Sequence, residues 1–574
     1  MSWFFGIFGE FQTDEIEKIS RICPQPLYNF EKENYKILAG GFGKTLYHSQ
    51  NIDTSWVVCG VGISHSDKNF SLYDSRSWDE ILSKPQLNTL PINGHYVAVI
   101  YSKQHIYCFT DKLGLRNIYI SKTGKNIVFS TRLDWLAKFR GNCSFNLAET
   151  ANRLFLGDMP TEGCIIKGIE RLTAGGSVYI KKNNISILHN KWLPESVPNI
   201  GINDCDTLLQ KFVSLPRNID SKLSFGLSGG MDSRYLFSII NSSCIKDWTA
   251  FTFGSIYYPD SRIASEICKL YNIPHFIPEQ PKMQPDEFMA AMREFAGSMQ
   301  FSKPISAFLD IDIRNYISFS NNNVIVMDGG FGEILRRGLY NRLLIKGKKS
   351  ILKKEPKSLL NSLIRNTGNT FIKDEVLRSM KKSLIMIVSK MLDTMPPAVS
   401  FGIENWLDLF SVRVKIAGAL ALEQSRLDST AISLTPFMQP EIINLAFSLP
   451  LDLKINSKMM RESIRKFTPK LGTFPLVKDN IFYPYILPTK LSKAYLKFKS
   501  KLKTPIVDNN LNELLNGTRE FVMDTVSSIS VQNFDLYDTV RIKHAAESYY
   551  SGNKKYGKFL NHWLAFELFR QEIE

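Results

Sequence analysis

Apolar residues follow two different patterns along the chain, and the change between them falls near residue 200. Up to residue 130 they occur in short runs of four to seven residues, separated by polar turns. Runs of this length, bounded by turn residues, predict β-strands. The expected strands span residues 3–8, 56–61, 95–101, 105–110, 117–121 and 127–130. Many short strands and few helices indicate a layered sheet domain, and Thr13 is the predicted N-cap of an early helix.

Beyond residue 205, apolar runs alternate with amphipathic segments of helical length. Helices are expected at residues 204–214, 234–241, 261–270 and 286–296, and strands at the start of 223–233 and at 248–254, 275–277 and 323–328. This alternation predicts a parallel sheet whose ligands bind at the carboxyl ends of the strands. A further long amphipathic helix is predicted at residues 406–425.

A polar segment with several prolines, residues 189–198, separates the two patterns and is the predicted linker. The chain therefore divides into a first domain at 1–195 and a second domain at 205–574. We predict an α+β N-terminal domain of the β-sandwich type, followed by an α/β domain with a parallel sheet. The length of 574 residues agrees with two to four domains of ~150 residues each.

Composition limits the environment of the protein more than its activity. The net charge of +16 predicts a positive surface, which suits nucleotides, acidic peptides, membranes and nucleic acids alike. The eight cysteines contain no Cys-x-x-Cys pair, which favours reduced thiols in a cytoplasmic protein over a zinc site. The N-terminus lacks the basic region of a signal peptide, and the apolar run at 384–388 is too short to span a bilayer.

The stretch with the most specific chemistry is the glycine loop, residues 228–233, which follows the first strand of the second domain. Gly229 and Gly230 allow the backbone to come close to a ligand, and successive N–H groups at a helix N-terminus bind anions. Ser228 and Ser233 add hydroxyl groups. The carboxylate of Asp232 suits a phosphate site only if Mg²⁺ lies between them. The Gly-Lys-Ser/Thr ending of the Walker loop is absent, and an ordinary glycine-rich turn is the alternative.

The Ser-Gly-Gly-x-Asp-Ser spacing of this loop resembles the pyrophosphate loop of the ATP-pyrophosphatase fold. Residues 327–333, Met-Asp-Gly-Gly-Phe-Gly-Glu, are similar to a second signature of the asparagine synthetase-like family, with Glu333 at its second acid. The resemblance implies that ATP and Mg²⁺ are bound, with Asp232 and Glu333 as metal ligands. It also implies that Lys478 stabilises the acyl transition state, although a single lysine is equally often a surface residue. The implied nucleotide-binding residues are Leu227, Ser228, Gly229, Gly230, Asp232, Ser233, Phe253, Asp328 and Gly329.

The first domain has a resemblance of its own. Residues 93–100, 110–116 and 130–136 are similar to parts of the class II glutamine amidotransferase domain. In that family an N-terminal cysteine attacks glutamine, whereas this chain has Ser2, a much poorer nucleophile. The resemblance therefore implies an amidotransferase scaffold without glutaminase activity. A role for Ser2 as an N-terminal nucleophile is the competing interpretation.

Taken together, the two resemblances imply an ATP-dependent ligase that adenylates a carboxylate and joins it to an amine. Gly330, Ile432 and Gln439 stand where related enzymes that use ammonia or form β-lactams carry acids, which disfavours those reactions. The chain is most similar to lasso-peptide cyclases, which implies a precursor peptide as substrate and a leader peptidase and a leader-recognition protein as partners.

Two alternatives remain open at this point. One is an asparagine synthetase-like or β-lactam synthetase-like enzyme that acts on a small molecule. Another is a non-catalytic basic binding protein, although no nucleic-acid recognition motif is present. The lysine-rich segments at 340–400 and 490–503 are solvated faces or binding sites for an acidic partner.

Overall fold

The structure is a computed structural model of the chain. It describes residues 1–50, 55–65, 69–83, 92–159, 161, 163–181, 184–190, 192–218, 221–243, 245, 247–279, 282–310, 324–364, 370–502 and 509–574. Parts of four predicted segments lie outside these ranges: Lys191 of the linker, Asn323 of the strand at 323–328, residues 365–369 of the lysine-rich segment at 340–400, and Lys503 of that at 490–503. One of the eight cysteines, Cys244, lies outside them as well.

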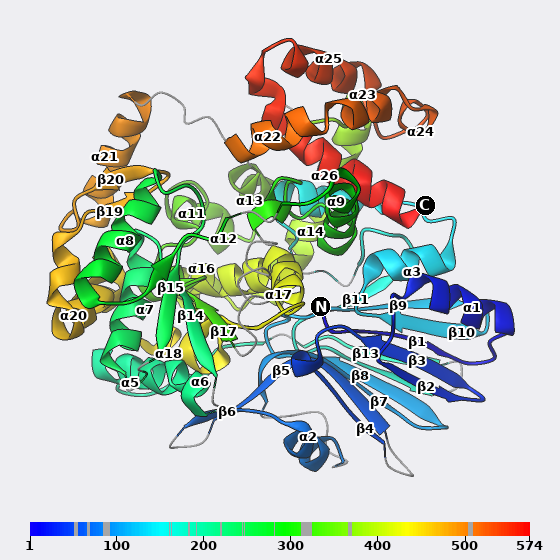
Figure 1. Ribbon diagram of the computed structural model, residues 1–574, viewed down its shortest axis with the longest axis horizontal. Helices are drawn as coiled ribbons and strands as arrows, with labels where there is room; N and C mark the ends of the chain where they lie inside the picture. Colours follow the sequence, from blue (N-terminus) through cyan, green and yellow to red (C-terminus); the bar gives the residue numbers. More distant parts are fainter. Residues whose placement is uncertain are drawn as a thin grey trace.

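The first 188 residues form two antiparallel sheets packed face to face (Figure 1). The six-stranded sheet has the order β11-β9-β10-β1-β3-β2, and the path of the other sheet is β13-β12-β8-β7-β5-β4, with β6 paired to β5. The strands of the first sheet are β1 Trp3–Phe8, β2 Tyr28–Lys32, β3 Tyr35–Gly40, β9 Ile118–Thr123, β10 Asn126–Ser130 and β11 Glu170–Leu172. Those of the second are β4 Leu46–Gln50, β5 Ser55–His65, β6 Phe70–Leu72, β7 Asn93–Tyr101, β8 His105–Thr110, β12 Ser177–Lys181 and β13 Asn184–Leu188.

Strand β1 explains why this domain shows so little alternation of apolar and polar residues. All six of its residues are buried. Phe4 and Phe8 face the core between the two sheets, whereas Trp3, Phe5 and Ile7 join a second core shared with helices. Because the sheet is covered on both faces, a continuous apolar run forms a strand that is buried on both sides.

The second domain contains a five-stranded parallel sheet in the order β16-β15-β14-β17-β18. Its strands are β14 Lys222–Gly226, β15 Trp248–Phe251, β16 His275–Phe276, β17 Val324–Asp328 and β18 Ile432–Leu434. The helices around them are α5 Ile202–Val213, α6 Leu215–Asn218, α7 Met231–Ser242, α8 Pro259–Tyr271 and α18 Pro440–Ser448. The sandwich and the parallel sheet together confirm the predicted fold class.

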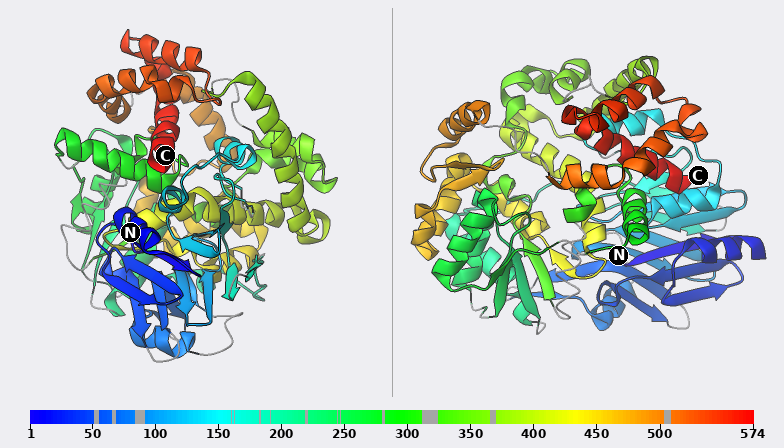
Figure 2. Two further views of the ribbon diagram at one scale, coloured as in Figure 1. Left: turned by 90° about the vertical axis from the view of Figure 1, so that its right-hand side faces the viewer. Right: turned by 45° about the horizontal axis from the view of Figure 1, so that its top comes forward.

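Most other helices form a layer above the two sheets (Figures 1 and 2). They include α9 Pro285–Met299, α11 Asn341–Lys346, α12 Lys348–Leu352, α13 Pro356–Leu363, α14 Asp374–Thr394, α16 Ile403–Ser411, α17 Ala421–Leu427, α22 Asn509–Gly517, α23 Arg519–Ser527, α25 Thr539–Tyr550 and α26 Gly557–Ile573. Helix α26 contacts α9 and also α3 Leu133–Arg140 of the first domain. One apolar core therefore runs from the strands of the sandwich into the C-terminal helices.

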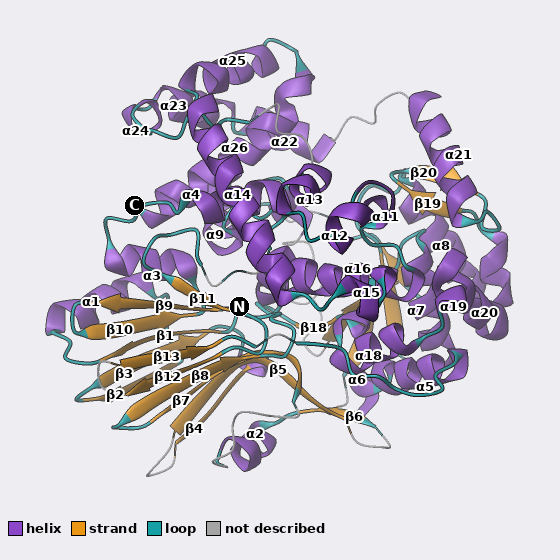
Figure 3. Ribbon diagram, turned by 180° about the vertical axis from the view of Figure 1, so that it is seen from behind, coloured by secondary structure: helices purple, strands orange, loops and turns teal. Residues whose placement is uncertain are grey.

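A small hairpin stands at the outer edge of the parallel sheet (Figures 1 and 3). It consists of β19 Leu476–Lys478 and β20 Ile481–Tyr483. Two helices flank it, α20 Lys458–Phe467 before the hairpin and α21 Thr489–Leu502 after it. In the described ranges, no helix is both long and apolar enough to cross a membrane. The seven cysteines of those ranges are all free thiols.

Three local predictions were wrong. Helix α1 Thr13–Ile22 takes Gln12 as its N-cap, with Glu15 accepting a hydrogen bond from the Gln12 N–H group, so Thr13 is the first helical residue. Helix α7 begins at Met231, three residues before the predicted start, because the helix opens directly from the glycine loop. The helix predicted at 406–425 is interrupted by a π-helical segment, Val412–Leu420, with a kink at Gly418. A Cβ atom at Gly418 would lie 2.7 Å from the carbonyl oxygen of Asp158, so contact with the first domain shapes this kink.

Candidate functional site

A cleft of about 650 Å³ opens at the carboxyl ends of β14, β15 and β17. Of the eleven residues that the sequence assigns to the site, ten line this cleft: Leu227, Ser228, Gly230, Asp232, Ser233, Phe253, Asp328, Gly329, Glu333 and Lys478. The eleventh, Gly229, lies beneath them, where its N–H group donates to Asp260 Oδ1 at 2.7 Å. Three strand ends and the separate hairpin thus place residues far apart in the sequence around one cavity.

The two serines of the glycine loop stabilise its conformation. Their hydroxyl oxygens lie 2.9 Å apart, and the backbone N–H of Gly230 donates to Ser228 Oγ at 3.2 Å. The N–H of Ser228 donates to Ser233 Oγ at 3.2 Å. The loop leads straight into α7, whose first N–H groups have no acceptor within the helix. An anion at the mouth of the loop would therefore meet oriented donors and the positive end of the helix dipole.

Gly229 is required because the hairpin packs directly on the loop. A Cβ atom at this position would lie 2.4 Å from Val477 Cγ2. The N–H of Val477 donates to the Gly229 carbonyl oxygen at 2.9 Å, which ties β19 to the loop. Lys478 follows Val477, is exposed and lines the cleft. The position of Lys478 over the cleft is thus set by the backbone of the loop.

Arg234 connects the glycine loop to the segment that leads into the hairpin. Its guanidinium group is fully buried and donates to the carbonyl oxygens of Gly229 at 3.2 Å and Phe474 at 2.8 Å, and also to that of Pro475. Burial lowers the pKa of Arg234 to about 10, so the group is still charged at neutral pH. A charged donor shared between carbonyl groups fixes the approach of β19 to the loop.

The turn after β17 brings a second set of groups against the glycine loop. A Cβ atom at Gly329 would lie 3.1 Å from the Ser233 nitrogen, and one at Gly332 would lie 2.7 Å from Asp232 Cβ. Phe331, between these glycines, has a φ of +66°, a left-handed conformation that is unusual for a bulky residue. Strained residues of this kind cluster at binding and catalytic sites, and here the turn presents Glu333 to the cleft.

The carboxylate of Asp232 is bound by Arg336, a contact that was not predicted from the sequence. Arg336 Nε donates to Oδ1 at 2.5 Å and Nη2 donates to Oδ2 at 2.7 Å. Both oxygen atoms predicted to bind Mg²⁺ are therefore engaged by a guanidinium group. Within the described part of the chain, no cluster of three or more His, Cys, Asp or Glu residues is arranged to hold a metal ion.

Asp232 and Glu333 suit a metal ion that is bound together with the phosphates of a nucleotide better than a metal ion that is bound by protein groups alone. Mg²⁺ commonly takes one or two carboxylates and completes its shell with phosphate oxygens and water. Asp232 and Glu333 would supply the carboxylates, provided that Asp232 leaves Arg336. The cleft is lined by four cations, Arg336, Arg461, Lys478 and Lys493, and by five carboxylates, Asp232, Asp260, Asp328, Glu333 and Asp479. A nucleoside triphosphate suits this mixed lining only if it brings Mg²⁺ with it.

Sequence reasoning missed Arg336, Asp260 and Arg461. Asp260 starts the helix after β15 and reaches the glycine loop, where burial raises its pKa. Arg461 donates from Nε to the Asn456 carbonyl oxygen at 3.0 Å and stacks 4.6 Å from the Tyr485 ring. None of the three stands in a recognisable motif. The only available signal was position, because Arg336 and Asp260 lie eight and nine residues after the ends of the parallel strands β17 and β15.

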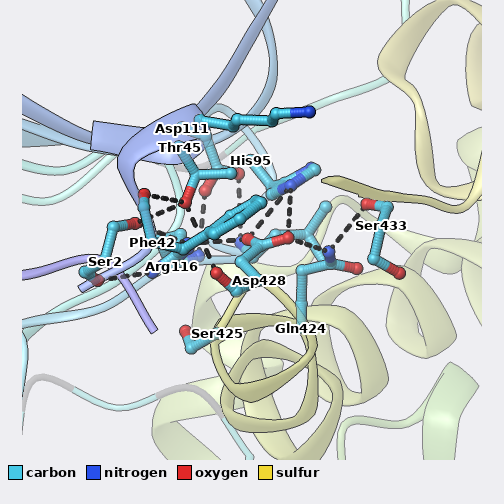
Figure 4. A network of polar contacts seen from close by, with 12 residues as sticks. Ser2, Phe42, Thr45, His95, Asp111, Arg116, Gln424, Ser425, Asp428 and Ser433 are labelled. Carbon is cyan, nitrogen blue, oxygen red and sulfur yellow. Dashed lines mark hydrogen bonds and ion pairs between the residues drawn. The ribbon is translucent and has the colours of Figure 1, made fainter. Parts of the chain in front are cut away.

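A second polar cluster joins the two domains (Figure 4). Asp428, at the end of α17, accepts a hydrogen bond from Arg116 Nη2 at 2.6 Å and lies 3.1 Å from His95 Nε2. Arg116 also donates to Ser2 Oγ at 3.3 Å, and Thr45 Oγ1 lies 3.1 Å from the same atom. The Ser2 hydroxyl is therefore fully buried and engaged by neighbouring side chains. Burial alone would raise the pKa of Asp428, but His95 and Arg116 hold it below its usual value.

No protein-family model matches the chain, and no curated protein matches it. Among solved structures, glutamine phosphoribosylpyrophosphate amidotransferase from B. subtilis, complexed with ADP and GMP, is 11% identical, with 57% of this chain and 81% of that chain covered and a TM-score of 0.22. NMN synthetase from Francisella tularensis is 18% identical over 38% of this chain and 97% of that chain, with a TM-score of 0.19. The U34-tRNA thiolase NcsA from Methanococcus maripaludis is 16% identical over 37% and 79%, with a TM-score of 0.18. At these values the similarities carry no functional conclusion for this chain.

Proposed function

We propose that the protein is an ATP-dependent ligase that activates a carboxylate as its acyl adenylate and transfers the acyl group to an amine. The observation that carries this proposal is the cleft at the carboxyl edge of the parallel sheet. It combines a glycine loop at a helix N-terminus, two carboxylates that line the cleft, Asp232 and Glu333, and an exposed lysine held over the loop. This combination suits the departure of pyrophosphate from ATP, which needs charge neutralisation on the phosphate side.

In this proposal each group has a separate task. The loop and the N-terminus of α7 hold the phosphates, and Mg²⁺ at Asp232 and Glu333 would neutralise them when bound. Lys478 stabilises the negative charge that develops as the carboxylate attacks. Phe253 and Leu227 line the part of the cleft next to β15 and contribute its apolar wall for the base.

The test is ATP–pyrophosphate exchange in the presence of pools of acidic peptides and of free amino acids. Exchange by the wild-type protein with one pool, together with its loss in Asp232→Ala, would support adenylation. Lys470→Ala, an exposed lysine outside the cleft, is the matched control and should exchange like the wild type. Absence of exchange and of ATP binding in the wild-type protein would refute the proposal.

The finer proposal is a lasso-peptide cyclase. Such an enzyme would adenylate an Asp or Glu side chain of a precursor peptide and close a macrolactam with the peptide's own α-amine. A leader peptidase and a leader-recognition protein would be its partners. This proposal rests on the resemblance of the sequence and is supported by the lysine-rich helix α21, whose residues Ser492, Lys493 and Leu496 line the cleft. Formation of AMP without a cyclic product would favour the small-molecule alternative instead.

A further inference from the structure

Helix α21 has two opposite faces with different surroundings. One face contributes Thr489, Ser492, Lys493 and Leu496 to the wall of the cleft. The opposite face bears Leu491, Tyr495, Phe498 and Leu502, which follow one another at intervals of four, three and four residues. Residues at this spacing form one continuous stripe along a helix. The exposed fractions of Leu491, Phe498 and Leu502 are 58%, 62% and 67%, so the stripe is open to solvent.

The stripe leads into a second cavity of about 460 Å³ beside the hairpin. Its lining is aromatic and rich in proline: Pro475, Phe482, Tyr483, Pro484, Tyr485 and Tyr495. Tyr495 belongs to both the stripe and this cavity, and Tyr483 lines both this cavity and the cleft. The stripe, the aromatic cavity and the cleft therefore adjoin one another through Tyr495 and Tyr483. Helix α21 and the hairpin lie together at the outer edge of the molecule (Figure 3).

Charge indicates which partner fits this surface. Helix α21 carries five lysines and no acidic residue. On a helix of 3.6 residues per turn, Lys490, Lys497 and Lys501 flank one side of the stripe, and Lys499 flanks the other. Large apolar side chains in the middle and cations at the rim match a partner with apolar anchors and acidic neighbours.

We propose that the stripe of α21 and the aromatic cavity are the docking surface for an acidic peptide with large apolar side chains, which is the acyl donor of the ligase. This inference rests on the proposed function for the identity of the reaction, because the docked peptide delivers its carboxylate into the adjoining cleft. Binding outside the cleft selects the peptide, while the reacting carboxylate alone enters the site. Docking of this kind holds the reacting groups together without requiring the cleft itself to recognise a sequence.

The aromatic cavity beside the stripe favours a peptide over two other partners that could bind a basic amphipathic helix, an anionic membrane and a second copy of this chain. An anionic membrane would cover the stripe but has no side chain to fill the aromatic cavity. A second copy of this chain would bring its own five lysines against the same face and meet like charge.

The experiment measures fluorescence anisotropy of labelled synthetic peptides with the full-length chain. The probe carries Glu on one helical face and Leu and Phe on the other, and the control probes replace Glu with Lys or the apolar residues with Ser. The double variants Phe498→Asp with Leu502→Asp, and Lys497→Glu with Lys501→Glu, should each raise the Kd of the acidic probe by about tenfold. Met386→Asp, an equally exposed apolar residue of α14, and Lys543→Glu of α25 are matched controls and should leave it unchanged.

ATP binding, measured by calorimetry in the presence of MgCl₂, separates this inference from the proposed function. All α21 variants should bind ATP as the wild type does. Peptide binding that is unchanged by both double variants overturns the inference, whatever the cleft does. Stripe-dependent binding of phosphatidylglycerol vesicles without peptide binding, or a dimer in sedimentation that the Phe498→Asp variant dissociates, also overturns it. Stripe-dependent peptide binding without any ATP binding leaves the docking surface standing and refutes the ligase.

Discussion

Arg336 and Asp232 form a two-pronged ion pair across the mouth of the cleft, with contacts of 2.5 and 2.7 Å. The two residues come from different strand ends and are 104 positions apart. Burial alone would lower the pKa of Arg336, but Asp232 outweighs burial and raises that pKa above its ordinary value, so the guanidinium group stays charged. A guanidinium group that already binds both oxygen atoms competes with a magnesium ion for the same carboxylate. The pair therefore sets a competition at the predicted metal site.

Replacing Arg336 with Gln should strengthen metal binding in the absence of nucleotide. Mn²⁺ should bind the variant about tenfold more tightly than the wild type, because Asp232 is released from Arg336. Electron paramagnetic resonance of Mn²⁺ measures this binding. Metal-free ATP should bind more weakly, since a cation has been removed from the cleft. Arg461→Gln is the control, because it removes a cation that does not contact Asp232. Equal Mn²⁺ affinity in the wild type and Arg336→Gln would show that the pair does not limit the metal site.

Lys478 should matter for rate much more than for ATP affinity. A donor aimed at developing charge typically contributes ~10²–10³ in kcat, and because Lys478 is exposed we expect Lys478→Ala to slow pyrophosphate exchange by about 10², the lower end of that range. The Kd of ATP should change by less than about threefold, because the proposed role of Lys478 acts on charge that develops only in the reaction. Lys478→Arg keeps the charge and should recover part of the rate. If Lys478→Ala changes only the Kd, the lysine binds the nucleotide and does not act in the chemical step.

Gly229→Ala should displace the hairpin from the loop. The new methyl group would lie 2.4 Å from Val477 Cγ2 and 2.7 Å from its Cβ, within packed chain on both sides. Overpacking of this kind costs ~1–3 kcal/mol, and here it also moves Lys478. Chemical denaturation and the exchange assay should both register the change. Gly230→Ala is the matched control for stability, because its methyl group would meet only Ser228 Oγ at 3.2 Å and Ser233 Oγ at 4.0 Å. Equal stability of the two variants would contradict the role given to Gly229.

The sequence predicted the elements of this fold well where the signal is local. Strands β1 and β8 have the predicted bounds, because each is a short apolar run ended by turn residues. The helix predicted at 406–425 failed because a tertiary contact at Gly418 overrides a regular apolar pattern. No local pattern contains that contact.

The residues of the candidate site were likewise predicted where the signal is local and missed where it depends on contacts between distant residues. Nine of the ten predicted residues that line the cleft lie at or after strand ends of the parallel sheet, where short-range spacing identifies them, and the tenth, Lys478, lies on the hairpin. Arg336 and Asp260 were missed since their partners are 104 and 31 positions away. The contact between Arg116 and Asp428 spans 312 positions and joins the two domains, so only the folded chain brings these residues together.

Asp428→Asn should loosen the contact between the domains in a pH-dependent way. The folded pKa of Asp428 lies below its ordinary value, so an unfolded chain takes up the proton first as the pH falls. The ion pair therefore stabilises the fold above about pH 4, and this contribution disappears as the pH drops through the lower, folded pKa. Removing one partner leaves Arg116 buried without its counter-ion, which costs ~3–5 kcal/mol at neutral pH.

Scanning calorimetry at a series of pH values measures this effect. At pH 7 the Tm of Asp428→Asn should fall by several degrees, and the difference from the wild type should shrink below pH 4. Asp452→Asn is the control, because Asp452 forms an exposed ion pair with Lys458 at 3.3 Å and such pairs contribute less than ~1 kcal/mol. A Tm difference that stays constant from pH 7 to acid would mean that Asp428 acts through shape alone. No difference at pH 7 would mean that the domains hold together through the shared apolar core, with the buried ion pair contributing nothing.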